Sequence, residues 1–200
     1  MTPTPGRASE APQRAESEPW LPQVLISYGQ KSNAELLLLY GFVVDRNLFD
    51  EVELTVSVDP TDKRYDEKVE FLKRQRLQPS MAFPLLIDRY SSELLQYLRL
   101  CCLLPSDGPL ETYEYGEPIS SSNERAAQAA LRDGCERALA LYPETEAEDA
   151  ALMENGRLFA SLSRNQRMTI KLRRNEKRIL LRTIRTCETA LEALESRAVL

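Results

Sequence analysis

Hydrophobic residues recur at helical spacing over most of the chain after residue 59. The clearest case is the last helix, expected from about residue 163 to 198, in which every third or fourth position is apolar (Leu180, Ile184, Cys187, Leu191, Leu194 and Ala198). Residues at this spacing form one stripe along a helix, which can pack lengthwise against neighbouring helices. Further helices are expected from residue 59 to the Pro79–Pro84 stretch, from Ser91 or Ser92 through the paired cysteines, and after the capping-type serine and threonine at 121 and 145. The pattern therefore predicts a mainly α-helical body over residues 59–200.

The segment before residue 59 has a different pattern, with short β-like runs on either side of one helix. Residues 24–29 are β-branched and aromatic and end in glycine, which is typical of a strand that enters a turn. Ser32 and Glu35 have the spacing of a capping box, so a helix should follow over residues 33–39. Because residues 36–39 are all leucine, we expect this helix to be buried on most sides. Apolar residues then alternate from Val52 to Val58, as in a half-buried strand.

Residues 1–22 differ again, because they hold five prolines, mixed charge and no aliphatic periodicity. Such a segment cannot bury enough apolar surface to order itself, and we expect it to be disordered. Its serine, alanine and arginine content leaves a chloroplast transit peptide open, whereas Glu10, Glu16 and Glu18 argue against one. The predicted organisation is a disordered segment (1–22), a short α/β segment (23–58) and a helical domain (59–200).

Composition and charge remove several classes of function. The chain has no histidine, which excludes Ser/His/Asp and Cys/His nucleophilic catalysis within it. With 26 basic and 31 acidic residues the net charge is -5, which disfavours a dedicated nucleic-acid binder. Between Arg164 and Arg185, however, there are nine basic residues and one acid. This basic segment can pair internally with the acidic residues around 144–149, bind an acidic protein partner or bind nucleic acid. The last is least favoured because the segment lacks interleaved aromatic residues.

The four cysteines, at positions 101, 102, 135 and 187, form no C-x-x-C pair and no metal-type spacing. We expect free thiols that pack as small hydrophobic residues, and no metal site. Reduced cysteines indicate an intracellular protein, and no stretch approaches the roughly 20 apolar residues of a membrane span. The expectation is a soluble protein of the chloroplast or of the cytoplasm or nucleus, with no membrane partner.

The run ISYGQKSNAELLLLYGFVVDRNLFDEVEL resembles the C-terminal end of the SET domain in protein-lysine methyltransferases of the Rubisco large-subunit methyltransferase (LSMT) type. The runs YSSELLQYLRL and RNQRMTIKLRRNEKRILLRTI resemble the helical substrate-binding domain of that family. The resemblance implies a mainly α fold, in which a helical substrate-binding domain follows a short α/β remnant of a SET domain. It also implies S-adenosylmethionine as cofactor and, as partner, a protein substrate that carries the target lysine.

The resemblance assigns roles to three aromatic residues. Tyr40, in the Y-G-F motif, would lie beside the target amine and the methyl donor, and Tyr28 would line the lysine channel, so both would be catalytic. Phe42 would form an apolar wall, so that Tyr40 and Phe42 would contact the cofactor. A phenol oxygen can accept a hydrogen bond from the amine and orient its lone pair. From the residues alone, all three would be core aromatics.

Two departures from the family pattern keep a second function open. The glycine-rich segment and the Asn-His-Ser element that bind the methyl donor in such SET domains have no match here, and Val52 stands where a further tyrosine is common. The chain is therefore interpreted as the C-terminal part of a SET-type protein-lysine N-methyltransferase. The alternative is a non-catalytic helical protein-binding module whose SET remnant is only structural.

Overall fold

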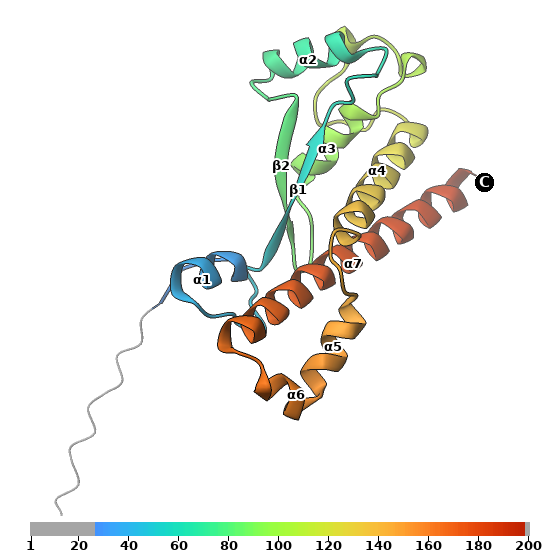
Figure 1. Cartoon of the computed structure of the whole chain (residues 1–200). Helices are drawn as coiled ribbons and strands as arrows, with labels where there is room; N and C mark the ends of the chain where they lie inside the picture. The colour runs from blue at the N-terminus through green and yellow to red at the C-terminus, as the bar shows by residue number, and fades with distance from the viewer. Residues whose placement is uncertain (1–26, 199–200) are drawn as a thin grey trace, which may run out of the picture.

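The computed structural model describes residues 27–198, with side chains through residue 196 (Figure 1). The elements are α1 (Asn33–Tyr40), β1 (Glu51–Ser57), α2 (Tyr65–Arg74), β2 (Ser80–Leu86), α3 (Ser92–Cys101), α4 (Ser121–Leu139), α5 (Glu146–Glu154), α6 (Gly156–Ser161) and α7 (Arg164–Ala198). Two 3-10 turns, Pro105–Asp107 and Leu110–Thr112, follow α3. The predicted mainly α fold is confirmed. The disorder expected for residues 1–22, and residues 24–26 of the first expected strand, lie outside the described residues.

Helix α7 is the longest described helix, and most of the other elements pack along it. It has 35 residues and so extends over about 52 Å at 1.5 Å per residue. Figure 1 shows α4 alongside its C-terminal half and α5 and α6 beside its N-terminal half. The predicted stripe is confirmed where it packs, because Leu180 and Cys187 are fully buried and Ile184 nearly so. Leu191 and Leu194, further along, are half-buried.

A two-stranded antiparallel ribbon of β1 and β2 extends from the α1 end of the molecule towards α2 (Figure 1). Strand β1 was predicted, whereas β2 was not, because Pro79 and Pro84 were interpreted as the end of a helix. The register pairs Glu53 with Pro84 and Leu54 with Phe83, so the proline lies within the strand. Proline lacks a ladder donor but is tolerated in an edge strand, and in a two-stranded sheet both strands are edges. The expectation of continuous helix after residue 59 is therefore wrong.

Two helix starts also differ from expectation. The carboxylate of Asp59 accepts hydrogen bonds from Thr61 N (2.8 Å) and Thr61 Oγ1 (2.7 Å), which makes a turn, and α2 begins only at Tyr65. The cap of α4 is Ser120 and not Ser121. The capping boxes of α1 and α5 and the serine cap at the start of α3 are confirmed.

Helix α1 forms where predicted but is not buried as predicted. Leu36 is 5% exposed, whereas Leu38 is 85% exposed and Leu39 is 57% exposed. The other elements of the described chain cover only the side of α1 that carries Leu36. Residues 27–29, the described end of the first expected strand, have no strand conformation.

The four cysteines are free thiols, as predicted. Cys135 and Cys187 are buried, and Cys101 and Cys102 are half-buried. Burial raises the pKa of Cys101 and of Cys135 to about 12, so these thiols stay protonated at neutral pH. Within residues 27–198 no helix is long and apolar enough to span a membrane.

Candidate functional site

The structure brings the three predicted site residues together beside the C-terminal end of α1, whose last residue is Tyr40. The ring centroids of Tyr28 and Tyr40 lie 4.7 Å apart and those of Tyr28 and Phe42 lie 5.2 Å apart, both in edge-to-face geometry. Tyr40 and Phe42 are 6.3 Å apart. Such pairs are mutually attractive by about 0.5–1.5 kcal/mol beyond the area they bury. Because Tyr28 is 46% exposed and Tyr40 is 45% exposed, they form an open aromatic surface and not the centre of a core.

Local sequence places these rings. The side chain of Ser32 accepts from Glu35 N (3.3 Å), and Ser32 N donates to the Glu35 carboxylate (3.0 Å), which fixes the start of α1. This backbone donor lowers the pKa of Glu35. At the other end Gly41 has φ +74°, a left-handed conformation that glycine adopts without steric cost. The turn at Gly41 places Phe42 beside Tyr40.

Buried hydrogen bonds of Asn33 hold the loop after α1 against the helix. Asn33 N donates to Asp50 Oδ1 (2.9 Å) and the Asn33 amide donates to Asp50 Oδ2 (2.6 Å) and to the Val44 carbonyl (3.0 Å). The Asn33 side-chain oxygen accepts from Val44 N at 2.8 Å. Asn33 is 0% and Asp50 is 2% exposed, and the first turn of α1 is a favourable place for a carboxylate. These side chains act on the aromatic residues only by positioning the loop.

Helix α7 ties the same loop to the helical body. The guanidinium of Arg164 donates to the Gly41 carbonyl (3.2 Å), and Lys171 Nζ lies 2.7 Å from an Asp45 carboxylate oxygen. The aromatic cluster therefore has a fixed position relative to α7.

Further along α7 the basic segment pairs with the acidic start of α5, as one of the sequence alternatives predicted. Arg173 binds Glu144 (2.8 Å) and Asp149 (3.1 Å). Arg174 pairs with Glu146 at 2.9 Å. The most buried pair is Lys177 with Asp149, at 2.6 Å, in which Lys177 also donates to the carbonyls of residues 144 and 145. Internal pairing is confirmed for these cations.

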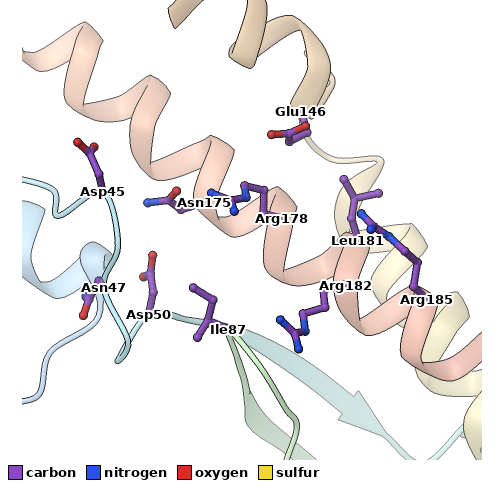
Figure 2. Close-up of a pocket in the computed structure, with 10 residues that line it drawn as sticks. All are labelled: Asp45, Asn47, Asp50, Ile87, Glu146, Asn175, Arg178, Leu181, Arg182 and Arg185. Atoms are coloured by element: carbon purple, nitrogen blue, oxygen red, sulfur yellow. The ribbon is translucent and has the colours of Figure 1, made fainter.

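Three arginines of the segment differ from their neighbours. Arg178, Arg182 and Arg185 are exposed and have no carboxylate within ion-pair distance among the described side chains. They line a groove with a volume of about 390 Å³. Figure 2 shows the side chains that surround it. Its floor is α7, with Asn175 and Leu181 beside the arginines. The walls are the Asp45–Asp50 loop with Ile87 on one side and Glu146 of α5 on the other. We name this feature the arginine groove.

The chemistry of the aromatic cluster fits one end of S-adenosylmethionine. Aromatic faces attract a cationic sulfonium and its polarised methyl group, and Tyr28 and Tyr40 each carry a phenol oxygen that can accept a hydrogen bond from a nucleophile. The cluster contains no charged group for the amino-acid end of that molecule. Tyr28, Tyr40 and Phe42 are therefore suited to the reacting methyl and not to the whole cofactor.

Comparison with known proteins gives the family. The family model for the Rubisco LSMT substrate-binding domain matches residues 59–180. The chain belongs to this family. Its described part shares the fold of Rubisco LSMT bound to sinefungin and monomethyllysine, with a TM-score of 0.73 and 28% identity over 87% of this chain and 42% of that one. The SET domain of LSMT bound to methyllysine and AdoHcy gives a TM-score of 0.71 and 28% identity over 86% of this chain and 41% of that one. The resemblance to SET-type methyltransferases of the LSMT type is thus confirmed.

The chain also has relatives that are named for a different target residue. The actin-histidine N-methyltransferases of Homo sapiens and Papio anubis are each 31% identical over an alignment 180 residues long. The match covers 82% of this chain and 29% of theirs. The chain thus spans less than a third of these relatives.

The three aromatic residues could be predicted from the sequence, whereas Asn33 and Asp50, which position them, could not. The pair is separated by 17 residues along the chain. Asn33 was visible only as the first residue of a helix and Asp50 only as an acid before a strand, so neither carried a signal of the contact.

Proposed function

We propose that this chain forms the C-terminal part of a SET-type protein N-methyltransferase that uses S-adenosylmethionine. Residues 23–58 contribute one edge of the active site, and residues 59–200 bind the protein substrate. The observation that carries the proposal is the aromatic cluster of Tyr28, Tyr40 and Phe42, which is partly exposed beside the C-terminal end of α1 in a chain with the LSMT fold.

Each aromatic residue has a definite task in this proposal. S-adenosylmethionine, when bound, supplies an activated methyl group. The Tyr40 hydroxyl accepts a hydrogen bond from the neutral target nitrogen and turns its lone pair towards the methyl carbon. Tyr28 lines the channel through which the target side chain enters. Phe42 excludes water from the side of the cluster that it covers.

Lysine is the proposed target, because solved LSMT structures of this fold contain lysine or methylated lysine. Histidine is the second candidate, because the relatives at 31% identity are actin-histidine N-methyltransferases. An imidazole N–H can donate to the same phenol oxygen, so the aromatic cluster by itself can accept a hydrogen bond from either lysine or histidine. The third reading is a non-catalytic protein-binding module.

A chimera tests the proposal. Residues 24–200 replace the matching C-terminal part of Rubisco LSMT, and transfer of a radiolabelled methyl group is measured to two peptides that differ only in a central lysine or histidine. Transfer to the lysine peptide supports the leading proposal, and transfer to the histidine peptide alone supports the second.

Calorimetric titration of the chimera with S-adenosylmethionine serves as the folding control. If the chimera binds the cofactor as tightly as the parent enzyme and methylates neither peptide, nor any protein in a cell extract, the catalytic proposal is wrong. The non-catalytic module then stands.

A further inference from the structure

The arginine groove carries positive charge that makes no ion pair with the described side chains. Lys171, Arg173, Arg174 and Lys177 each have a carboxylate partner at 2.6–3.1 Å. The three arginines at 178, 182 and 185 follow on the same helix, are exposed and have no such partner among the described side chains.

The carboxylates on the groove walls do not neutralise these arginines. Asp45 is paired with Lys171 and Glu146 with Arg174. Asp50 is buried and accepts two hydrogen bonds from Asn33 at the start of α1. Asn33 is uncharged and does not offset Asp50, but the three arginines outnumber this one wall carboxylate that has no cationic partner among the described side chains. The floor of the groove therefore presents an excess of guanidinium groups to a ligand.

The groove also contains apolar surface of the kind that a peptide uses. Leu181 lies on the floor between the arginines, and Ile87 lies on the wall opposite (Figure 2). The residues that line the groove include no aromatic side chain, so bases have no stacking platform there. A lining that combines guanidinium groups with apolar side chains, and has no aromatic ring, matches a polypeptide better than a nucleic acid.

The position of the groove connects it to the aromatic cluster. Its wall begins at Asp45, three residues after Phe42, and a chain of that length spans at most about 11 Å. A segment that lies along α7 in the groove and reaches Asp45 is therefore within about 11 Å of Phe42 along this wall.

We propose that the arginine groove binds an acidic segment of the protein substrate, in which glutamate or aspartate side chains pair with Arg178, Arg182 and Arg185 and an apolar side chain contacts Leu181. This inference rests on the proposed function in one respect, that the bound segment belongs to the methylated protein. Guanidinium groups are suited to the role because they bind carboxylates in a two-pronged geometry.

Binding is tested with the full chain and a fluorescein-labelled peptide of alternating glutamate and leucine, by fluorescence anisotropy at low salt. The test variant combines Arg178→Glu, Arg182→Glu and Arg185→Glu. The matched control combines Lys73→Glu, Arg74→Glu and Arg76→Glu, which makes the same change in net charge at exposed positions at the end of α2. The milder variant Arg182→Gln guards against a triple variant that does not fold.

The groove reversal is expected to weaken peptide binding by at least about 10-fold, and the α2 control by less than about 2-fold. Arg182→Gln should weaken binding about 2- to 5-fold, and raising the salt concentration should weaken binding by the unmodified chain. Equal losses for the groove reversal and the control would overturn the proposal, because only net charge would then matter. Tighter binding of labelled oligothymidylate than of the peptide would also overturn it, in favour of a nucleic-acid ligand.

The result separates this inference from the proposed function because the binding assay involves no methyl transfer. If the chimera methylates its peptide but the full chain does not bind the acidic probe, the proposed function is supported and the proposed role of the groove is wrong. If the full chain binds the probe through the three arginines but the chimera is inactive, the proposed role of the groove is supported and the methyl-transfer function is wrong.

Discussion

At the scale of single residues, the candidate site separates groups that could react from groups that hold them in place. Tyr40 is 45% exposed, whereas Asn33 and Asp50 are buried and bind each other and the loop after α1. The group proposed to react and the groups that hold the loop in place are therefore different residues of the same segment.

Tyr40→Phe should reduce turnover in the LSMT chimera far more than it changes affinity for the peptide. The hydroxyl is assigned to the reacting nitrogen, and removing one positioned polar group at a reaction centre costs about 10- to 1000-fold in rate. The edge-to-face contact with Tyr28 needs only the ring, so the fold should persist. Steady-state kinetics separates the two effects, and unchanged kcat would show that Tyr40 is only a packing residue.

Glu176 makes a pH-dependent contribution to stability. Burial raises the pKa of this half-buried carboxyl above 4.5, more than the hydrogen bond from the Tyr142 hydroxyl (2.8 Å) lowers it. Since the folded state holds the proton more tightly than the unfolded state, the charged form is disfavoured on folding, and this penalty develops as pH rises above about 4.5.

Glu176→Gln should therefore raise the melting temperature at pH 7, because the amide oxygen can still accept from Tyr142 and no charge is buried. The gain should shrink as pH falls towards 4.5, where the native carboxyl is protonated as well. Thermal melts of both proteins between pH 4 and pH 8 measure the difference. A gain that is independent of pH would assign the effect to helix propensity and not to ionisation.

At the scale of elements, the sequence predicted what depends on neighbours along the chain. The capping boxes at Ser32 and Thr145 and the stripe of α7 are local patterns with a local physical cause, and all are confirmed. Strand β2 was missed because its prolines mask it and because its formation depends on pairing with β1, about 30 residues earlier. The exposure of Leu38 was missed because four leucines in a row indicate burial but do not say what covers them.

The candidate site was likewise predictable only in part. The aromatic residues could be named because the motif around them resembles a known family. The arginine groove could not be named, because Arg178 and Lys177 look alike in sequence. Only the fold shows that Lys177 meets Asp149 while Arg178 faces solvent.

The contact between α7 and α5 should depend on the paired arginines. The combination Arg173→Glu and Arg174→Glu places new carboxylates beside Glu144, Glu146 and the buried Asp149, and it should destabilise the fold by about 2–4 kcal/mol. Urea denaturation gives the free energy of unfolding.

A matched pair on the same helix is the control for that measurement. Arg182→Glu with Arg185→Glu makes the same change in charge at exposed positions without ion pairs in the described structure, and should cost less than about 1 kcal/mol. Equal costs for the two pairs would mean that the contacts to α5 contribute nothing specific to stability.

At the scale of the whole molecule, the core lies on one side and an apolar surface is left on the other. The buried cluster joins the ribbon, α3, α4 and α7, and includes Leu54, Phe83, Leu131 and Leu180. Helix α1 and the loop after it, by contrast, carry large exposed apolar side chains: Leu38, Leu39, Tyr40, Val44, Leu48 and Phe49. Exposed apolar surface of this extent is typical of a surface that binds another polypeptide.

This surface should make the isolated chain self-associate without contributing to its folding. Leu38 is 85% exposed and Leu39 is 57% exposed, so Leu38→Lys with Leu39→Lys removes little packing and should change the melting temperature by less than about 3 °C, as is usual for surface substitutions. Each leucine that leaves a contact between chains forfeits about 1.5–3 kcal/mol of burial, so association should weaken at least about 10-fold. Sedimentation velocity over a range of concentrations measures it. Leu36→Lys is the contrasting variant, because Leu36 is 5% exposed, and it should lower the melting temperature strongly through the loss of α1 packing. If instead the double lysine variant unfolds as readily as Leu36→Lys, the two exposed leucines pack within the chain and the surface they form is not free to bind.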